Sequence, residues 1–550
     1  MTTGHNDDKN DQVDADSPRP AEPAQPVNRR GFFQGAAWLA VGASSAALAQ
    51  PNVRPETSPN DIGDPNQVLD DRLARAQRWA GANPRNFVRP RPGVDHNVVI
   101  VGGGQSGSSI AYWLARKGIG GVELIDQAAP GQAGIWRTIA RMEQLRTPKT
   151  MPGLEQENPM IGFRAWFETL NGPGAFDALD RIPRLAWADY LDWFRSINGV
   201  QISYRTRLLA IEPEGALLRL HLETEGVRRE VTTRKLVLAN GYAGAGGPNV
   251  PGFLRALPAA YWSHTADSIA SSQVAGKVVG IVGAGSSAFD AAGFALENGA
   301  TEVHMFNRRP NVAYQGPARP GVAPAPAGPP PDRGHPNVLA LSFELPDIVR
   351  WRNFVARDRA VSSVPTDSIA RATGHDNFML HLNSSLEDVT VDNNQIRARA
   401  NAETWRFDHI ISGTGYRIDL AAQSELDGIA DAVELWGNRY EPEAGDESDA
   451  AAIHPYLGPA FEFLPRNGAN AEHLRNIHCF NLAAALSFGK PVGDVPSAAD
   501  HPRLVNAIAR DLYIDSVDTE AHREFINRPA TAQDPAPYEG SVYGRTRSAG

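Results

Sequence analysis

Residues 98–126 decide the fold of this chain, and they begin Val98-Val99-Ile100-Val101-Gly102-Gly103-Gly104-Gln105-Ser106-Gly107. Four β-branched residues in succession indicate a buried parallel strand, and the glycines that follow have the spacing G-x-G-x-x-G. A helical apolar pattern comes next, and a second apolar run, Val122-Glu123-Leu124-Ile125, ends at Asp126. This strand–turn–helix–strand order with a closing acid predicts a dinucleotide-binding βαβ unit.

Each part of this unit has a physical role in binding. Glycine lets the backbone approach a pyrophosphate closely, and the N-terminus of the helix offers N–H groups and the positive end of its dipole. An acid at the end of the second strand accepts hydrogen bonds from ribose hydroxyls. The alternative is an ordinary glycine-rich turn, which the surrounding strand–helix–strand pattern disfavours. We therefore expect the dinucleotide to bind at Gly102, Gly104, Gln105, Ser106, Gly107 and Asp126.

Composition narrows the class of protein. The chain has 550 residues, 42% of them hydrophobic and 21% charged, which is typical of a globular protein with more than one domain. A formal net charge of -10 argues against nucleic acid as a partner. The single cysteine, Cys479, excludes an internal disulfide and a C-x-x-C redox pair, and it lies in an apolar run typical of a core strand.

The N-terminal region has the pattern of an export signal. Residues 1–27 are polar, and Asn28-Arg29-Arg30-Gly31-Phe32-Phe33 then precedes an uncharged stretch that ends in Ala47-Leu48-Ala49. Paired arginines, a short apolar stretch and an A-x-A end predict a twin-arginine signal, cleaved after Ala49 and read by the Tat export machinery. The alternative is a short N-terminal helix. The signal predicts a periplasmic protein, and the alternative without a signal is a cytoplasmic protein. No stretch favours stable membrane insertion.

A second nucleotide unit contains Gly283-Ala284-Gly285-Ser286-Ser287-Ala288, the permitted variant G-x-G-x-x-A. Its second strand ends at Asn307, in the register that Asp126 has in the first unit, and two arginines follow. A neutral amide does not repel a 2′-phosphate, and an arginine pairs with one. Solvated surface charge is the alternative for the two arginines. We expect this unit to bind NADP rather than NAD, at Gly283, Gly285, Ser286, Ser287, Arg308 and Arg309.

Both units, Gly134-Ile135-Trp136 and the turn Ile411-Ser412-Gly413-Thr414-Gly415-Tyr416 together resemble a family of flavoproteins with two dinucleotide sites. These are the flavin-containing, Baeyer–Villiger and N-hydroxylating monooxygenases. The resemblance implies an α/β fold with two Rossmann-like domains, FAD in the first and NADPH in the second. It implies an FAD domain made of two separated segments, with the NADP domain inserted between them. It also implies that Trp136 lies near the flavin and Asp494 near its pyrophosphate and ribityl end.

The expected organisation follows from these units. The expected segments are a signal peptide at 1–49, a linker or arm at 50–93, FAD-binding parts at 94–250 and 396–525, an NADP-binding domain at 251–395 and a loose tail at 526–550. A proline-rich loop occupies 317–336. Further expected elements are helices around 69–79, 163–170 and 187–197 and a strand around 201–205.

The catalytic residue is unknown from the sequence. The family's identifying stretch runs F-x-G-x-x-x-H with Trp or Tyr four residues later, and only His264 matches it here, because Pro258, Ala260 and Ser268 occupy the other places. Lys149 follows the loop that is expected near the flavin, where a cation could stabilise an oxygen anion. A structural histidine and an ordinary surface lysine are the alternatives.

The resemblance implies an NAD(P)H-dependent oxidoreductase, most simply a monooxygenase that inserts one oxygen atom of O2 into a small organic substrate through a flavin peroxide. Because the flavin carries that chemistry, neither a catalytic dyad nor a metal site is required. Two alternatives stay open. One is an FAD-dependent dehydrogenase or oxidase with a vestigial nicotinamide site, which the export signal favours, and the other is a non-catalytic nucleotide-binding module. The substrate is not indicated by the sequence.

Overall fold

A computed structural model describes residues 65–151, 153–155, 158–315, 336–360, 363–528 and 538–541. The predicted signal, the first part of the arm, most of the proline-rich loop and much of the tail lie outside the described residues. The helix expected around 69–79 is α1 (Pro65–Ala80). Among the described residues, no helix combines the length and apolar character that a membrane span needs.

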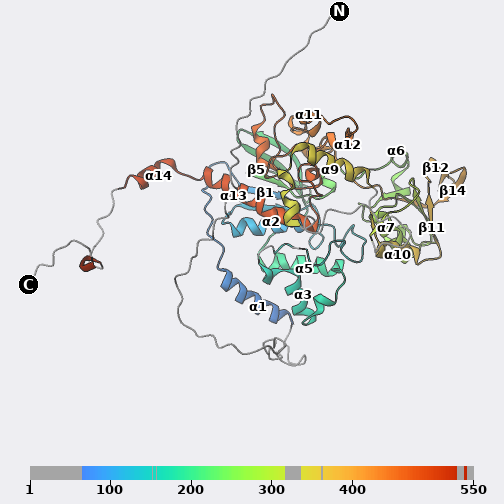
Figure 1. The fold of residues 1–550 in the computed structure, drawn as a ribbon, viewed down its shortest axis with the longest axis horizontal. Coiled ribbons are helices and arrows are strands. Elements are labelled where there is room, and N and C mark those ends of the chain that lie inside the picture. The colour runs from blue at the N-terminus through green and yellow to red at the C-terminus, as the bar shows by residue number, and fades with distance from the viewer. Residues whose placement is uncertain are drawn as a thin grey trace, which may run out of the picture. The chain divides into compact units, whose positions relative to one another are not determined.

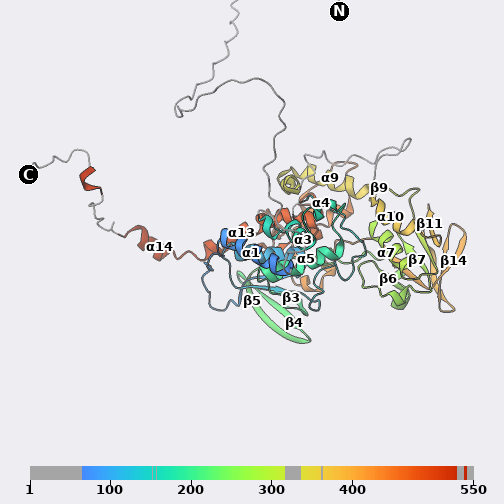
Figure 2. The same cartoon turned by 90° about the horizontal axis from the view of Figure 1, so that it is seen from below.

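The first sheet is built around the first glycine motif. Its strands are β1 (His96–Val101), β2 (Val122–Ile125), β3 (Thr206–Glu214), β4 (Leu217–Thr224), β5 (Val227–Leu238) and β16 (Ile477–Cys479). Their order is β2-β1-β5-β4-β3, and β16 also pairs with β5. β1 is parallel to β2 and β5, as the βαβ pattern predicts, whereas β3, β4 and β5 form an antiparallel meander (Figure 2).

The strand expected at 201–205 is not formed there. Strand β3 begins one residue later, at Thr206, and Ser203 makes only an isolated bridge to Ile125. Arg205 adopts φ +50, a left-handed conformation that interrupts an extended strand. The prediction of a strand near this position was therefore correct, but the predicted residues 201–205 lie just before the strand that forms.

Strand β5 joins the two halves of the first sheet. Its first half pairs with β4, and its second half pairs with β1 on one edge. On the other edge, Leu236–Leu238 pair in parallel with β16, which arrives from the far end of the chain. The first sheet therefore contains two segments that are widely separated in the sequence, as the fold class predicts.

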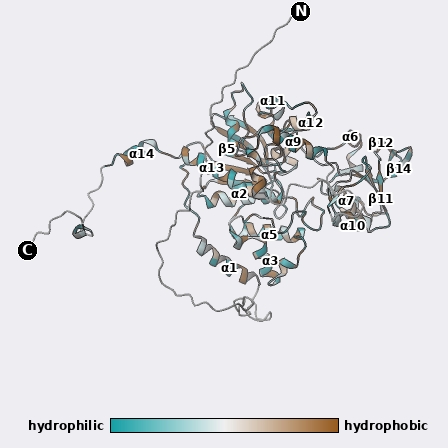
Figure 3. Cartoon of the chain, in the orientation of Figure 1, coloured by the Kyte–Doolittle hydropathy of each residue, from teal (hydrophilic) through white to brown (hydrophobic). Residues whose placement is uncertain are grey.

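Helices pack on the first sheet, and a further group of helices forms a second core. Helix α2 (Gln105–Arg116) packs against α13 (His501–Asp515), and their apolar residues join one core with β1 and β5. A second core, rich in aromatic rings, is formed around α3 (Phe163–Asn171), α4 (Ala175–Ala178) and α5 (Arg184–Ile197). Hydrophilic and hydrophobic residues alternate along α3 and α5 (Figure 3), which is why each buries one face.

The second sheet is wholly parallel. Its strands are β6 (Trp262–His264), β7 (Val278–Val282), β8 (Glu302–Asn307), β11 (Phe378–Leu382) and β15 (His409–Ser412), in the order β11-β8-β7-β15-β6. Residues Val279 and Ile281 face the core with α7 (Ser286–Glu297) and α10 (Thr366–Thr373). The alternate residues Val278 and Val282 face a separate core, because successive side chains of a strand point to opposite faces.

That opposite face is covered by a small antiparallel sheet. Its strands are β12 (Glu387–Asp392), β13 (Gln395–Ala400) and β14 (Glu403–Phe407), and α6 (Gly252–Arg255) contacts β12. The predicted domain boundary at 395 falls inside β13, and the second sheet continues to Ser412 in β15. The second nucleotide unit therefore includes chain that was assigned to the second FAD-binding part.

A helical segment links the two sheets. It contains α8 (Pro336–Leu339) and α9 (Asp347–Arg359), and it comes between β9 (Tyr314–Gln315) and β10 (Val364–Pro365), which pair with each other. Figure 1 shows α9 beside α11 (Trp436–Arg439) and α12 (Asp449–Ala452), and Trp351 of α9 packs in one cluster with Trp436. The described chain ends with α14 (Thr519–Ile526) and a short turn.

Candidate functional site

The first glycine motif forms a turn that only glycine can occupy. Gly102 has φ +107, and a Cβ there would lie 2.4 Å from the carbonyl oxygen of Ala239. A Cβ on Gly107 would lie 1.9 Å from the carbonyl oxygen of Gly102. These two glycines therefore bring β1, β5 and α2 into close contact, as the fingerprint predicts.

The middle glycine, Gly104, has a different environment. It is the N-cap of α2 and no side chain caps this end of the helix, so the N-terminal N–H groups and the helix dipole are open to an anion. A Cβ on Gly104 would meet Gly134 at 3.4 Å, which is ordinary contact. Gly104 and Gly134 therefore lie in close contact where the fingerprint meets the Gly134-Ile135-Trp136 loop. A side chain at Gly104 would add bulk at the open N-terminus of α2, which is the part of the motif that could bind a pyrophosphate.

Asp126 supports the same turn. Its Oδ2 accepts a hydrogen bond from the Gly103 N–H at 2.7 Å, and its Oδ1 accepts one from the Ala128 N–H at 2.7 Å. Each oxygen keeps further acceptor capacity for ribose hydroxyls. Arg195, which was not predicted, reaches this turn from α5, with Nη1 3.5 Å from the Gly103 carbonyl and 3.4 Å from Ser108 Oγ. Sequence spacing carries no sign of Arg195, because α5 lies outside the βαβ unit.

Gln105 connects the first motif to a turn near the other end of the chain. Its Nε2 donates to the Gly493 carbonyl at 3.2 Å, and its Oε1 accepts from Trp187 Nε1 at 3.2 Å. Asp494, which follows Gly493, caps a 3₁₀ turn by accepting a hydrogen bond from the Ser497 N–H at 3.1 Å. Burial raises the pKa of Asp494, against the opposing effect of its hydrogen bonds with Ser497. The structure therefore brings Asp494 beside the first motif.

Trp136 lies in the loop that faces the first motif. Its side chain packs against the aromatic core of α3 and α5, and its carbonyl accepts a hydrogen bond from Arg184 Nη1. The ring therefore joins the glycine loop to this core. Its predicted position near the flavin stays a prediction.

The second glycine motif repeats the geometry of the first. Gly283 has φ +103, and a Cβ there would lie 2.6 Å from the Gly413 carbonyl. Gly285 is the N-cap of α7 without a side-chain cap, and open space surrounds the position of its missing Cβ. Ser286 Oγ donates to the Ser363 carbonyl at 3.5 Å, and Ser287 is exposed. This helix end is therefore also open to an anion.

The arginines predicted to bind a 2′-phosphate follow β8. Both Arg308 and Arg309 are exposed, directly after Asn307 at the carboxyl end of the strand. Asn307 donates from Nδ2 to the Asn311 carbonyl at 2.9 Å and accepts from the Arg309 N–H at 3.3 Å, which shapes the turn. Two cations thus lie at the same end of the second sheet as the open helix terminus of α7.

Lys149 is held by backbone carbonyls. Its Nζ donates to the carbonyls of Phe176 at 3.0 Å, Asp177 at 2.8 Å and Leu179 at 2.5 Å. An ammonium has three donors, so all of them are used at the end of α4. This arrangement gives Lys149 a structural task, and its catalytic role stays a prediction.

His264 ends strand β6 and is 1% exposed. Its Nδ1 accepts a hydrogen bond from the Ala266 N–H at 3.0 Å. Burial lowers the pKa of the imidazole, which favours the neutral form. The ring lies edge-on to Tyr416, with 5.9 Å between centroids. His264 therefore belongs to the carboxyl end of the second sheet, where its catalytic role also stays a prediction.

Two tyrosines connect the ends of the two sheets, a contact that was not predicted although Tyr416 ends the turn that carries the resemblance. Tyr242 follows β5 and Tyr416 follows β15, and their rings meet edge-on with 5.7 Å between centroids. Burial and the nearby Asp494 carboxylate raise the pKa of the Tyr242 hydroxyl, while Arg146 opposes them. Ligands in open α/β sheets bind at the carboxyl ends of the strands. The junction of the two sheets is therefore the candidate reaction region.

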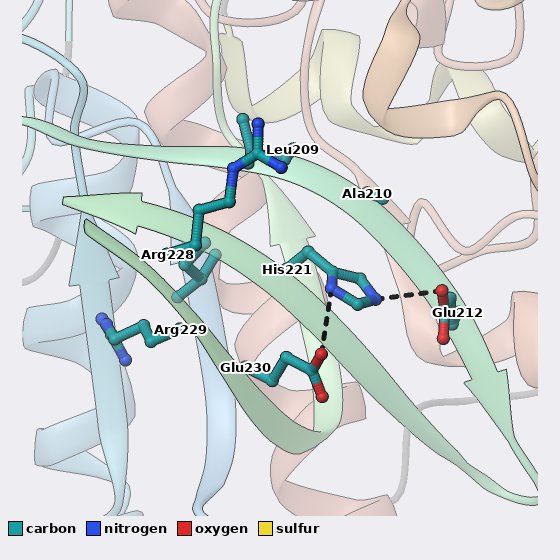
Figure 4. A pocket seen from close by; sticks show the side chains of 8 residues that line it. Leu209, Ala210, Glu212, His221, Arg228, Arg229 and Glu230 are labelled. Atoms are coloured by element: carbon teal, nitrogen blue, oxygen red, sulfur yellow. Dashed lines mark ion pairs between the residues drawn. The ribbon is translucent and has the colours of Figure 1, made fainter. Parts of the chain in front are cut away.

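A separate hollow of about 660 Å³ lies on the β3–β4–β5 meander (Figure 4). Its lining comes from these three strands and includes none of the predicted site residues. His221 there lies 3.0 Å from Glu212 and 3.5 Å from Glu230, and both carboxylates are more than half exposed. Exposed ion pairs of this kind are common on antiparallel sheets, so the hollow does not compete with the junction as the functional site.

Comparisons with known proteins agree with this arrangement. Residues 96–321 match the family described as pyridine nucleotide-disulphide oxidoreductase. The chain is 35% identical over 474 residues to the FAD-dependent urate hydroxylase of Xanthomonas campestris pv. campestris, which covers 84% of this chain and 96% of that protein. The buried Cys479 is the sole cysteine, so the disulphide chemistry of the first description does not apply here.

Solved structures show the same fold. The ornithine hydroxylase of Pseudomonas aeruginosa matches with a TM-score of 0.57 and 18% identity, covering 76% of this chain and 99% of that one. The ornithine N-hydroxylase of Kutzneria sp. 744 matches with a TM-score of 0.58 and 16% identity, over 76% and 99% of the two chains. The identity and coverage shared with the urate hydroxylase establish the family. The chain belongs to the flavoprotein monooxygenases, in the group that contains the FAD-dependent urate hydroxylase.

Proposed function

We propose that this enzyme is an FAD- and NADPH-dependent monooxygenase whose substrate is urate or a closely related planar oxopurine. The observation that carries the proposal is the match to a urate hydroxylase along 96% of that protein's length. The two open helix termini at Gly104 and Gly285 support the use of two dinucleotides. The overall reaction places one atom of O2 in the substrate and releases the other as water, with NADPH as the source of two electrons.

The residues of the first motif fit FAD. The open N-terminus of α2 at Gly104 would bind the pyrophosphate and supply its hydrogen bonds. Asp126 would accept from the ribose, while Asp494, beside Gln105, would lie toward the ribityl end. Hydride acceptance and oxygen activation are the chemistry that bound FAD supplies. The protein's own task is to bind, orient and exclude water.

The residues of the second motif fit NADPH. The open end of α7 would bind its pyrophosphate, and the exposed Arg308 and Arg309 would pair with its 2′-phosphate. Tyr242 and Tyr416 close the junction between the two sites with apolar ring faces. Arg146 lies near Tyr242, with its guanidinium paired to the Asp290 carboxylate. The flat rings of the two tyrosines suit a planar oxopurine, which can stack on an aromatic face.

Anaerobic mixing tests the proposed function. We expect purified protein to be yellow, to be bleached rapidly by NADPH, and to consume NADPH in air faster when urate is added. The Gly285→Val variant should keep its flavin and lose the NADPH response, since a side chain would block the open end of α7. Bleaching by a reduced organic substrate with none by NADPH would instead identify a dehydrogenase or oxidase. NADPH bleaching without any effect of oxopurines would overturn the substrate assignment alone.

We also propose that the enzyme is exported to the periplasm by the Tat machinery. The support is the sequence Asn28-Arg29-Arg30-Gly31-Phe32-Phe33 with its apolar stretch and the A-x-A end at Ala49. This pathway carries folded proteins, which suits an enzyme that must acquire FAD inside the cell. Replacing Arg29 and Arg30 with Lys should retain uncleaved protein in the cytoplasm. Fractionation that finds wild-type protein only as full-length cytoplasmic chain would refute export and would favour the cytoplasmic alternative.

A further inference from the structure

A loop of the first nucleotide unit is ion-paired to the helix of the second. Arg146 lies in the chain between the Gly134-Ile135-Trp136 loop and Lys149, and its Nη2 is 2.5 Å from Oδ2 of Asp290. Asp290 belongs to α7, the helix that begins at the second glycine motif. The Asp290 side chain is 3% exposed and that of Arg146 34%. The pair therefore joins the two dinucleotide sites at a largely buried carboxylate.

Both oxygens of this carboxylate are engaged. Its Oδ1 accepts a hydrogen bond from Ser368 Oγ of α10 at 2.7 Å, while Oδ2 pairs with Arg146. Arg146 is the cation in direct contact with this buried carboxylate, and a buried carboxylate is destabilised when its ion pair is broken. Arg146 thus stabilises the arrangement of α7 and the loop in which the two side chains meet.

A second set of contacts fixes the same loop to the second sheet. Arg141 donates from Nη1 to the Thr265 carbonyl at 2.9 Å and from Nη2 to the Asp267 carbonyl at 2.5 Å, just beyond β6. Arg371 of α10 donates from Nη1 to the Arg141 carbonyl at 2.7 Å. The loop is therefore tied to α10 and to the end of β6 as well as to α7.

We propose that Arg146 and Asp290 are positioning residues that set the separation of the two dinucleotide sites and thereby the rate of hydride transfer from NADPH. This inference rests on the proposed function for its kinetic consequence. Hydride transfer requires reacting atoms about 3–3.5 Å apart, and a misplacement of about 1 Å can slow a reaction about 10²-fold. An ion pair that joins the fingerprint helix of one site to a loop of the other has direct control over that distance.

The test compares Arg146→Met, Asp290→Asn and the double variant with Asp511→Asn. The last is the matched control, because Asp511 pairs with the buried Lys235 at 2.8 Å within the first nucleotide unit alone. FAD content, the NADP+ dissociation constant and the limiting rate of anaerobic flavin bleaching at saturating NADPH are measured for each. We expect the first two single variants to retain FAD and to bleach about 10- to 100-fold more slowly. The double variant should be no slower than either single variant, and the control should bleach at the wild-type rate.

Hydrogen–deuterium exchange keeps the two proposals separable. In Asp290→Asn, the exchange of backbone amides should rise both in α7 and in residues 139–147, and this measurement does not depend on flavin reduction. In the Asp511→Asn control, exchange in these two segments should remain unchanged. A wild-type enzyme that NADPH does not bleach would refute the proposed function, and the exchange data would still decide on the ion pair. Unchanged exchange in both segments, wild-type bleaching rates in the variants, or equal slowing by Asp511→Asn would each overturn the positioning role.

Discussion

Replacing Gly104 by Val should remove FAD from the protein and leave its fold intact. Gly104 has φ -64 and ψ -167, an extended conformation that valine adopts without strain. Its Cβ would lie 3.4 Å from Gly134, which is an ordinary contact, so the added side chain would stand at the open helix N-terminus without a backbone clash at Cβ. The expected stability cost is about 1 kcal/mol, the usual cost of an apolar residue at a helix N-cap.

The loss of flavin affinity should be much larger than this cost. A pyrophosphate displaced from the N-terminus of α2 loses about two charge-assisted hydrogen bonds, each worth about 1.5–3 kcal/mol. Their sum, about 3–6 kcal/mol, corresponds to a weakening of about 10²- to 10⁴-fold. The assay is the ratio of flavin to protein absorbance after purification, followed by titration of the apoprotein with FAD. Its matched control is Gly285→Val, the same change at the N-cap of α7, which should retain FAD.

A further variant separates this steric effect from general damage. Gly107→Ala should unfold the unit, because its Cβ would lie 1.9 Å from the Gly102 carbonyl oxygen. Gly104→Val should instead melt within a few degrees of the wild-type apoprotein. The reasoning is refuted if Gly104→Val purifies with a full complement of FAD.

Three other predictions address charge. Changing Arg308 and Arg309 to Ala should raise the NADPH concentration needed for half-maximal bleaching about tenfold or more and leave NADH unaffected, because only NADPH carries a 2′-phosphate; equal losses would contradict the assignment. Burial raises the pKa of Glu123, but hydrogen bonds from His96 and Arg229 outweigh this and lower it to about 2. The ionised carboxylate therefore stabilises the folded protein above about pH 4.5, and this stabilisation is lost as the pH falls toward 2. Denaturant titrations of Glu123→Gln and wild type should differ most near neutral pH and converge in acid. Lys149→Met should lower the melting temperature with unchanged flavin reoxidation, and slower reoxidation at unchanged stability would favour the catalytic role.

The first nucleotide unit could be predicted because its constraints are local. Gly102, Gly107 and Asp126 lie within one strand–turn–helix–strand segment, and each is demanded by backbone geometry that the spacing already contains. The second unit was predicted for the same reason. Its boundary was placed too early, since the largely polar strands β12–β14 gave no sign of which sheet they would cover.

The junction of the two sheets could not be predicted from spacing. Tyr242, Tyr416 and Arg146 are separated widely in the chain. Tyr242 and Arg146 look like ordinary loop residues, and the Ile411–Tyr416 turn gave no sign that Tyr416 would contact Tyr242. They meet because the carboxyl ends of parallel strands gather at one edge, which is a property of the fold rather than of any motif. Lys149 illustrates the converse, since its position after a glycine loop suggested chemistry and its three carbonyl partners indicate a structural task.

The pairing of β5 with β16 imposes an order on biosynthesis. A ribosome completes the whole second sheet before Ile477–Cys479 emerge to pair with Leu236–Leu238. Until then the first sheet presents an open strand edge, which is a template for intermolecular pairing. The turn with Asp494 emerges later still, so the nascent chain cannot enclose FAD on this side before synthesis is nearly complete. Chains that terminate before Ile477 therefore carry both an unpaired β-edge and an incomplete flavin site, which makes them prone to aggregation and to degradation.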